Sequence, residues 1–368
     1  MNEHTEFGTF FLPGPTEIRP EVLAAMQRPM VGHRGAEISE LIARLETGLS
    51  ALFRTERPVY LSTSSASGMM EAAVTNLSRR RVLCLVCGAF SQRFYEIARA
   101  CGRPADRMDV EWGLPNLPDA VAGKLSERPG RYDLVTVVHS ETSTGVLNPV
   151  AEIARAVHAF DDVLLAVDTV SSMAGAPVLT DEWGLDFVLT GTQKAVAVPP
   201  GLALAVASER ALSRAAEVEA RGWYFDLLGF ERRMESWQTP TTPAVSLIYA
   251  LARQVERIRE EGLENRWERH RAMAGRAHAW VAALAERTGR RFTVLAPEGY
   301  RSPTVTVVEL PEGVDGRAIV DGVRQSGFTI APGYGRLAER SVRIGHMGDH
   351  TPQELEAVLG ALSTALAG

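Results

Sequence analysis

From about residue 60 onward, short apolar runs alternate with amphipathic segments, and this alternation is the feature that most constrains the fold. The apolar runs are expected to form strands, at 58–65, 81–88, 132–140, 163–170, 185–192 and 202–208. Helical periodicity marks the segments 68–77, 90–102 and 149–160. Near-continuous apolar strands separated by helices predict a mainly parallel sheet that is covered on both faces, which is an α/β arrangement.

The C-terminal part of the chain has a different texture. A long helical pattern at 243–289, interrupted around Gly262, leads away from the sheet. Strand, helix, strand, strand and helix patterns then follow, at 304–310, 316–327, 328–333, 341–348 and 351–367. This order predicts a compact α+β second domain, as the length of the chain also favours. We therefore expect an N-terminal arm at 1–17, a large domain at 18–258 and a small domain at 259–368.

Composition restricts the class of protein and its partners. The chain has 368 residues, of which 45% are hydrophobic and 23% charged, as in a soluble globular enzyme. Its formal net charge of −6 leaves no basic surplus, so nucleic acid is not an expected partner. We see no signal peptide and no run of roughly 18 apolar residues, so a cytoplasmic protein without a membrane partner is expected. Of the three cysteines, Cys84 and Cys87 form a C-x-x-C within a predicted strand and are interpreted as core residues, ahead of a metal or redox role, and no metal site is expected.

Lysine usage singles out one position. Of the 39 basic residues, only Lys124 and Lys194 are lysines. Lys194 lies in the small-residue stretch TGTQKAVAVPPG, after a turn that follows an apolar strand. Turns at the carboxyl edge of a parallel sheet are where α/β proteins place ligands. An amine condenses with an aldehyde and a guanidinium does not, so we expect Lys194 to form a Schiff base; the alternative is a packed stem whose amine reaches water.

A carboxylate ends another apolar strand. Four of the five residues before Asp168 are Val or Leu, so this carboxylate is expected at the mouth of a buried strand, where it needs a partner. One known partner is the pyridinium nitrogen of pyridoxal phosphate, the cofactor that requires a Schiff-base lysine. Asp168 could instead cap or pair with the following turn. Together with Lys194, it favours the cofactor.

Three further features could complete such a site. The turn STSSASG, at 62–68, joins a strand to a helix and offers hydroxyls and free N–H groups to a phosphate. Phe90 follows a strand and could cover the face of a pyridine ring, although a core position is the commoner fate of phenylalanine. Arg343 points away from its strand neighbours Val342 and Ile344, and could clamp a substrate carboxylate or else lie on an exposed face.

Motifs along almost the whole chain are similar to those of one enzyme group: LPGPTEIRPEVLAAM, VGHRG, HSETSTGVLNP, VDTVSSMAGAP, DEWGLDFVLTGTQKA, PPGLALAVAS, GLENRWERHR, RSPTVTVVELPEGVDG and VRIGHMG. The sequence resembles the class V group of fold-type I pyridoxal-phosphate enzymes, and looks most like the alanine–glyoxylate and serine–glyoxylate aminotransferases. The resemblance implies the PLP-dependent transferase fold type I, in which a large domain with a mainly parallel seven-stranded sheet precedes a smaller C-terminal α+β domain. It also implies pyridoxal 5'-phosphate as the cofactor.

The resemblance assigns cofactor-binding roles position by position. Lys194 would carry the Schiff base and later shuttle the proton, and Asp168 would pair with the pyridine nitrogen. The ring would lie between Phe90 and Val170, with Thr142 on its hydroxyl. Phosphate contacts would come from Ser65, Ala66, Ser67 and Gln193, and across the subunit boundary from Gln238 and Thr241.

Substrate binding and assembly are also implied by the resemblance. Arg343 would hold the substrate carboxylate, and Gly14 would lie near the substrate mouth. Because Thr241 would reach the partner's site, a homodimer with shared active sites is expected. Two departures stand out: the phosphate turn has less glycine than in many relatives, and Gln238 occupies a position where tyrosine is common.

The implied reaction is a ping-pong transamination from a small amino acid, alanine or serine, to a 2-oxo acid, glyoxylate or pyruvate. A lyase of the same fold is an alternative, whereas a cysteine desulfurase is disfavoured because no cysteine follows Cys101. Alternatives of another class are a non-catalytic protein and a dinucleotide-binding module, the latter suggested by GYGRLA at 333–338.

Overall fold

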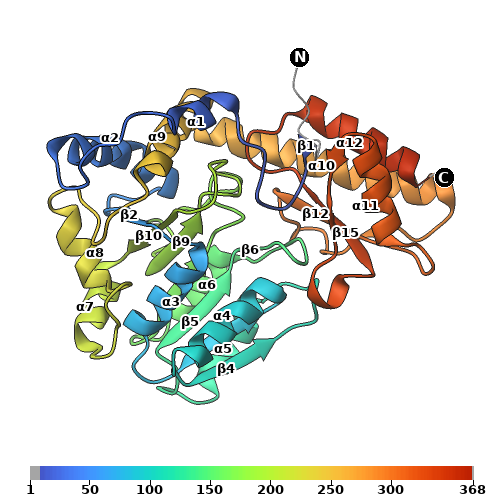
Figure 1. The fold of residues 1–368 in the computed structure, drawn as a ribbon. Coiled ribbons are helices and arrows are strands. Elements are labelled where there is room, and N and C mark those ends of the chain that lie inside the picture. The colour runs from blue at the N-terminus through green and yellow to red at the C-terminus, as the bar shows by residue number, and fades with distance from the viewer. Residues whose placement is uncertain (1–8, 367–368) are drawn as a thin grey trace.

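A computed structural model of the chain describes residues 9–366, so residues 1–8 of the expected arm lie outside the described part (Figure 1). The helices are α1 Pro20–Ala25, α2 Ala36–Phe53, α3 Ala66–Leu77, α4 Ala89–Ala100, α5 Pro118–Ser126, α6 Val150–His158, α7 Glu209–Glu217, α8 Leu227–Met234, α9 Val245–Glu261, α10 Leu263–Thr288, α11 Gly316–Gln325 and α12 Pro352–Ala365. The strands are β1 Thr9–Phe10, β2 Tyr60–Ser62, β3 Val82–Val86, β4 Ala105–Asp109, β5 Leu134–Val138, β6 Ser140–Glu141, β7 Val146–Leu147, β8 Leu164–Asp168, β9 Phe187–Gly191, β10 Ala203–Ala207, β11 Thr293–Val294, β12 Val305–Glu309, β13 Phe328–Thr329, β14 Ala331–Pro332 and β15 Ser341–Gly345.

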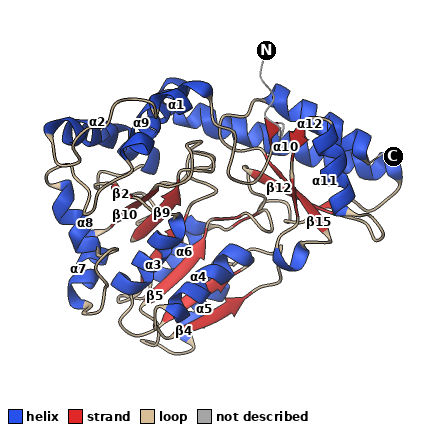
Figure 2. Cartoon of the chain, in the orientation of Figure 1, coloured by secondary structure: helices blue, strands red, loops and turns tan. Residues whose placement is uncertain are grey.

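The large sheet has seven strands in the order β2-β10-β9-β8-β5-β3-β4. Its pairs are parallel except those of β10, which runs antiparallel to both β2 and β9. Every residue of β3, β5, β8, β9 and β10 is buried, whichever face it points to, so both faces of the sheet are covered. The predicted α/β fold with a mainly parallel sheet is confirmed (Figure 2).

One strand of this sheet had no apolar signal in the sequence. The strand β4 reads ADRMD and pairs with β3 at the edge of the sheet. An edge strand has one neighbour and is partly exposed, so polar residues are tolerated there and hydrophobic patterning does not reveal it. Next to it, Cys84 and Cys87 are buried and unbridged, which confirms their interpretation as core cysteines.

A long pair of helices connects the sheet to the C-terminal part. Helix α9 ends at Glu261 and α10 begins at Leu263, separated by Gly262 at a φ of 83°, a backbone conformation that favours glycine. The predicted interruption is therefore confirmed. Figure 1 shows α10 running from the large sheet along the second sheet.

The second sheet has the order β11-β12-β15-β14 and is antiparallel. It packs with α10, α11 and α12 around a second apolar core. The expected single strand at 328–333 is wrong: β13 pairs with β1 near the N-terminus, whereas β14 pairs with β15. The exact domain boundaries at 17/18 and 258/259 stay a prediction.

The GYGRLA segment does not have the setting of a dinucleotide-binding turn. It lies between β14 and β15 and contains the short 3-10 helix Gly335–Leu337, rather than opening an α-helix after a strand. Separately, none of the helices in the described range 9–366 has the combination of length and apolar character that crossing a membrane requires.

Candidate active site

Lys194 lies in the loop between β9 and β10, at the carboxyl end of β9. Its side chain is buried, with 7% of the residue exposed, so it does not extend into water. The amine donates a hydrogen bond to the carbonyl of Pro13 and lies 5.6 Å from the centroid of the Phe90 ring. The N-terminal arm thus covers the lysine from one side, and helix α4 supplies an aromatic ring on another.

The surroundings make the Lys194 amine a weaker base. Burial lowers its pKa to about 8, and the positive charge of Arg343 acts in the same direction. The carboxylates of Asp168 and Glu141 oppose this effect without overcoming it. A sizeable fraction of the amine is therefore neutral near pH 8, as a nucleophile or a proton acceptor requires.

Asp168 ends β8, the strand beside β9 in the sheet. Because these strands are parallel, their carboxyl ends bring Asp168 and Lys194 to the same edge. The Asp168 carboxylate accepts a hydrogen bond from the amide of Val170 at 2.7 Å. Burial raises its pKa to about 7, although the Val170 amide lowers it. A cation bound beside Asp168 would stabilise its ionised form and so lower its pKa.

The N-terminus of α3 is suited to an anion. Ser65 precedes the helix in an extended conformation, and no side chain among residues 9–366 caps it. The Gly68 amide donates to the carbonyl of Ser65, which leaves the amides of Ala66 and Ser67 beside the hydroxyls of Ser65 and Ser67, and the helix dipole favours negative charge there. A phosphate would fit these donors.

One cavity of about 180 Å³ joins these features. Nine of the predicted site residues line it: Ser65, Ala66, Ser67, Phe90, Thr142, Asp168, Val170, Gln193 and Lys194. Sequence reasoning missed the other five, which are Met70, Arg93, Val138, Ser140 and Ser171. Arg93 could have been found from its spacing, since it lies three residues after Phe90 on the same helix and its guanidinium is 4.9 Å from the Phe90 ring centroid.

Glu141 is a buried residue that the sequence analysis did not single out. Its carboxylate accepts hydrogen bonds from the amides of Phe90 and Ser91 and from the Ser91 hydroxyl. It therefore holds the first turn of α4, and with it the Phe90 ring. The neighbouring Thr142 shares a hydrogen bond with Ser171, so its hydroxyl already has an orientation at the cavity wall.

Arg343 reaches this region from β15 of the second sheet. It is 7% exposed, so the alternative of a surface arginine is wrong. Its Nε donates to the carbonyl of Pro332 at 2.9 Å, and its guanidinium lies 5.2 Å from the centroid of the Tyr334 ring. Tyr334 in turn stacks on Phe90, with the centroids 5.6 Å apart. Burial lowers the pKa of Arg343 to about 10, and the group stays charged at neutral pH.

The structure places the remaining predicted residues in two different settings. Gly14, at a φ of 98°, lies directly against the Lys194 side chain. Gln238 and Thr241 are partly exposed and do not line the cavity. The Gln238 amide oxygen instead accepts from Arg34 at 3.3 Å. Within one chain, therefore, these two residues are separated from the site.

Comparison with known proteins identifies the family of the chain. The sequence model of the class-V aminotransferase family matches residues 10–336. An uncharacterized aminotransferase of Methanocaldococcus jannaschii is 39% identical, over 96% of this chain and 91% of that protein. A serine–glyoxylate aminotransferase of Methylorubrum extorquens is 32% identical, over 96% and 89%. The solved structure of a subgroup IV aspartate aminotransferase from Thermus thermophilus superposes with a TM-score of 0.87 at 32% identity, covering 98% and 99% of the two chains. The chain therefore belongs to the class-V aminotransferase family, and it is an aminotransferase.

Proposed function

We propose that this protein uses pyridoxal 5'-phosphate to move an amino group from a small amino acid, alanine or serine, to glyoxylate or pyruvate, in two successive half-reactions. The observation that carries the proposal is the buried amine of Lys194, whose pKa is about 8, at the wall of a cavity that Asp168 also lines. Burying a lysine whose charged form is disfavoured lowers the free energy of unfolding. Its chemistry as an amine accounts for that cost.

The cavity residues fit the cofactor group by group. Ser65, Ser67 and Gln193 would bind the phosphate at the start of α3, with the backbone of Ala66. Asp168 would pair with the ring nitrogen, and the ring would lie between Phe90 and Val170 with Thr142 near its hydroxyl. When bound, pyridoxal phosphate supplies an aldehyde for the amines and a ring that accepts the electrons of the substrate's Cα–H bond.

The chain's own residues would then bind the substrate and move the proton. Arg343 offers a charged guanidinium to the carboxylate that donor and acceptor share, so one arginine serves both half-reactions. The neutral Lys194 amine would take the proton from the substrate's α-carbon and return it to the carbon that was the cofactor's aldehyde carbon. The arm at Pro13 and Gly14 would keep water away from this amine.

The choice of substrates rests on resemblance and on Arg343. A relative named as a serine–glyoxylate aminotransferase supports a small donor and glyoxylate as acceptor. The arginine supports any substrate with an α-carboxylate.

We also propose a homodimer in which each chain completes its partner's site. Thr241 and Gln238 lie outside the cavity of their own chain, and Arg34 fixes the segment between them through the carbonyls of Thr239 at 2.6 Å and Pro240 at 3.1 Å. Because Arg34 fixes the backbone of this segment while Gln238 and Thr241 stay partly exposed, these two side chains are suited to contact a second subunit. A cytoplasmic location stays part of this proposal.

A half-reaction tests the proposed function. Purified protein saturated with pyridoxal phosphate is mixed with alanine or serine, without an acceptor, and the products are measured by chromatography. Transamination gives pyridoxamine phosphate and the matching 2-oxo acid in equal amounts, and glyoxylate then restores the aldehyde. Lys194→Ala serves as the control and should give neither product.

The alternative lyase has a different signature in the same experiment. It would release ammonia and pyruvate from serine while the cofactor stays in its aldehyde form. That result, or the absence of pyridoxamine phosphate with every donor tried, would contradict the proposal.

A further inference from the structure

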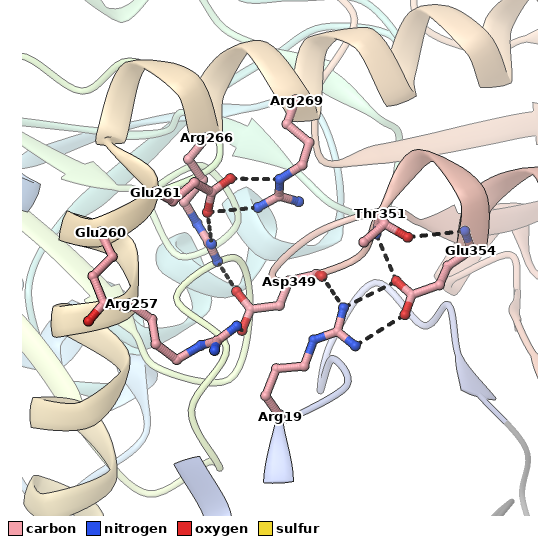
Figure 3. A pocket seen from close by; sticks show the side chains of 9 residues that line it. All are labelled: Arg19, Arg257, Glu260, Glu261, Arg266, Arg269, Asp349, Thr351 and Glu354. Atoms are coloured by element: carbon pink, nitrogen blue, oxygen red, sulfur yellow. Dashed lines mark hydrogen bonds and ion pairs between the residues drawn. The ribbon is translucent and has the colours of Figure 1, made fainter. Parts of the chain in front are cut away.

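A second cavity, of about 580 Å³, lies where helices α9 and α10 meet. Figure 3 shows its side chains, which come from the N-terminal segment, from both helices and from the segment after β15. The lining residues are Arg19, Arg257, Glu260, Glu261, Arg266, Arg269, Asp349, Thr351 and Glu354. Three parts of the chain that are far apart in sequence therefore border this cavity.

The charges at this junction balance one another. Its four arginines face four carboxylates, and ion pairs join members of the two sets, such as Arg19 to Glu354 and Arg257 to Asp349. A surface with no excess of either sign does not select a charged ligand. The ion pairs around this cavity are better explained as links between the N-terminal segment, helices α9 and α10, and the segment after β15.

Arg266 differs from the other arginines of the junction by its burial and by one contact. It is 1% exposed. Its guanidinium pairs with Glu261 at 2.7 Å and with Asp349 at 2.8 Å (Figure 3). It also donates to the carbonyl of Ala195 at 2.8 Å, the residue directly after Lys194. Burial alone would raise the pKa of Asp349, but its contacts with Arg266 lower it, so the carboxylate stays ionised.

The turn that contains this carbonyl is conformationally strained. The amide of Ala197 donates to the carbonyl of Lys194 at 2.9 Å, which closes the turn. Ala197 has a φ of 59°, a conformation that costs an alanine free energy and persists only where the surroundings hold it. Arg266 donates a hydrogen bond to the carbonyl of Ala195 within this turn. The ion pairs with Glu261 and Asp349 fix the orientation of the guanidinium.

We propose that Arg266 is a positioning residue for Lys194: it links the first turn of α10 to the strained turn that carries the lysine, and so sets where the amine lies. The proposal rests on the function proposed for Lys194. Without this grip, the turn relaxes and the lysine side chain gains access to water. The charged groups that face the amine are Arg343, Asp168, Glu141 and Arg93, and none of them is altered by a substitution at Arg266.

The experiment uses the small number of lysines in the chain. Acetic anhydride labels amines, and mass spectrometry of peptides reads the labelling of Lys194 separately, with the partly exposed Lys124 as an internal reference. We compare Arg266→Lys with Arg269→Lys in the full-length protein without cofactor, as a function of pH. Arg269 is the matched control, because it also pairs with Glu261, at 2.7 Å, but donates to the carbonyls of Gly348 and His350 instead of the lysine turn.

Arg266→Lys should raise the labelling rate of Lys194 about tenfold relative to Lys124, and should move its apparent pKa upward from about 8 toward the ordinary lysine value. It should also weaken the binding of pyridoxal phosphate, measured by equilibrium dialysis, by about tenfold. Arg269→Lys should change neither quantity, even if both variants lose thermal stability to a similar degree. Equal Lys194 labelling in the two variants would overturn the proposal.

Two further outcomes are covered by the design. If Arg266→Lys does not fold, Asp349→Asn replaces it in the same comparison, because it weakens the 2.8 Å attachment of the guanidinium while keeping the side-chain shape. The labelling needs no cofactor. A wild-type protein that fails to bind pyridoxal phosphate would therefore contradict the proposed function and leave the comparison between Arg266 and Arg269 intact.

Discussion

Gly14 lies so close to Lys194 that a methyl group on its Cα would come within 2.2 Å of the lysine Cδ. The backbone of the N-terminal arm thus forms one wall of the space that the lysine side chain occupies. Gly14 also has a φ of 98°, which side chains disfavour. Both the contact and the conformation require glycine here.

Gly14→Ala should therefore displace either the arm or the lysine, and should lower kcat/KM by about 10- to 100-fold. Gly130→Ala is the control for backbone strain, since Gly130 has a φ of 76° and open space where the methyl would lie. Steady-state kinetics of the two variants check the prediction. A similar loss in both would show that strain, and not contact with Lys194, is responsible.

The buried Lys194 should make the cofactor-free protein less stable than it could be. Its folded pKa of about 8 lies below its ordinary value, so the folded state disfavours the proton. The penalty is full below about pH 8 and disappears as the pH rises toward the unfolded pKa of about 10.4. Lys194→Met should thus raise the free energy of unfolding by up to about 3 kcal/mol at pH 7, and by little near pH 10.

Urea unfolding of both proteins at the two pH values measures this difference. Lys124→Met, at a partly exposed lysine, is the control: pairing with Glu127 raises the pKa of Lys124, so its loss should bring no gain in stability at pH 7. A gain at position 194 that is the same at pH 7 and pH 10 would indicate better packing instead of relief of a buried charge.

Arg343→Lys should raise the KM for donor and acceptor together, by about 10- to 100-fold, because an ammonium does not reproduce the bidentate contact of a guanidinium with a carboxylate. Arg340→Lys, on an exposed side chain shortly before it in the chain, should have no effect on either KM. The two KM values are obtained from initial rates with each substrate varied in turn. A change for one substrate alone would mean that Arg343 serves only one half-reaction.

Thr241→Val should weaken the binding of pyridoxal phosphate by about tenfold, although Thr241 does not line the cavity of its own chain. In the proposed dimer, this substitution removes one hydrogen bond to a charged phosphate across the subunit boundary. Thr242→Val, at the exposed neighbouring residue, is the control. Equilibrium binding, together with sedimentation to establish the dimer, provides the measurement; unchanged affinity would contradict the shared site.

Local sequence patterns predicted most of the large domain correctly. Strands such as β8 and β9 are apolar on both faces, and amphipathic helices follow a different period, so each element could be recognised within its own residues. The edge strand β4 could not, because its polar residues reflect partial exposure at a sheet edge. The segment 328–333 was also wrong as one strand, since its pairing with β1 depends on residues more than 300 positions away.

The sequence by itself determined the site's components: a lysine in a chain that otherwise uses arginine, an aspartate after an apolar run, and a hydroxyl-rich turn before a helix. Only the tertiary structure decided how deeply these side chains are buried, how their pKa values shift and which contacts position them. The amine is buried under Pro13, Glu141 anchors the turn of Phe90, and Arg266 grips the carbonyl of Ala195. Such contacts join residues from separate elements, and their strength depends on burial and distance, which local periodicity does not encode.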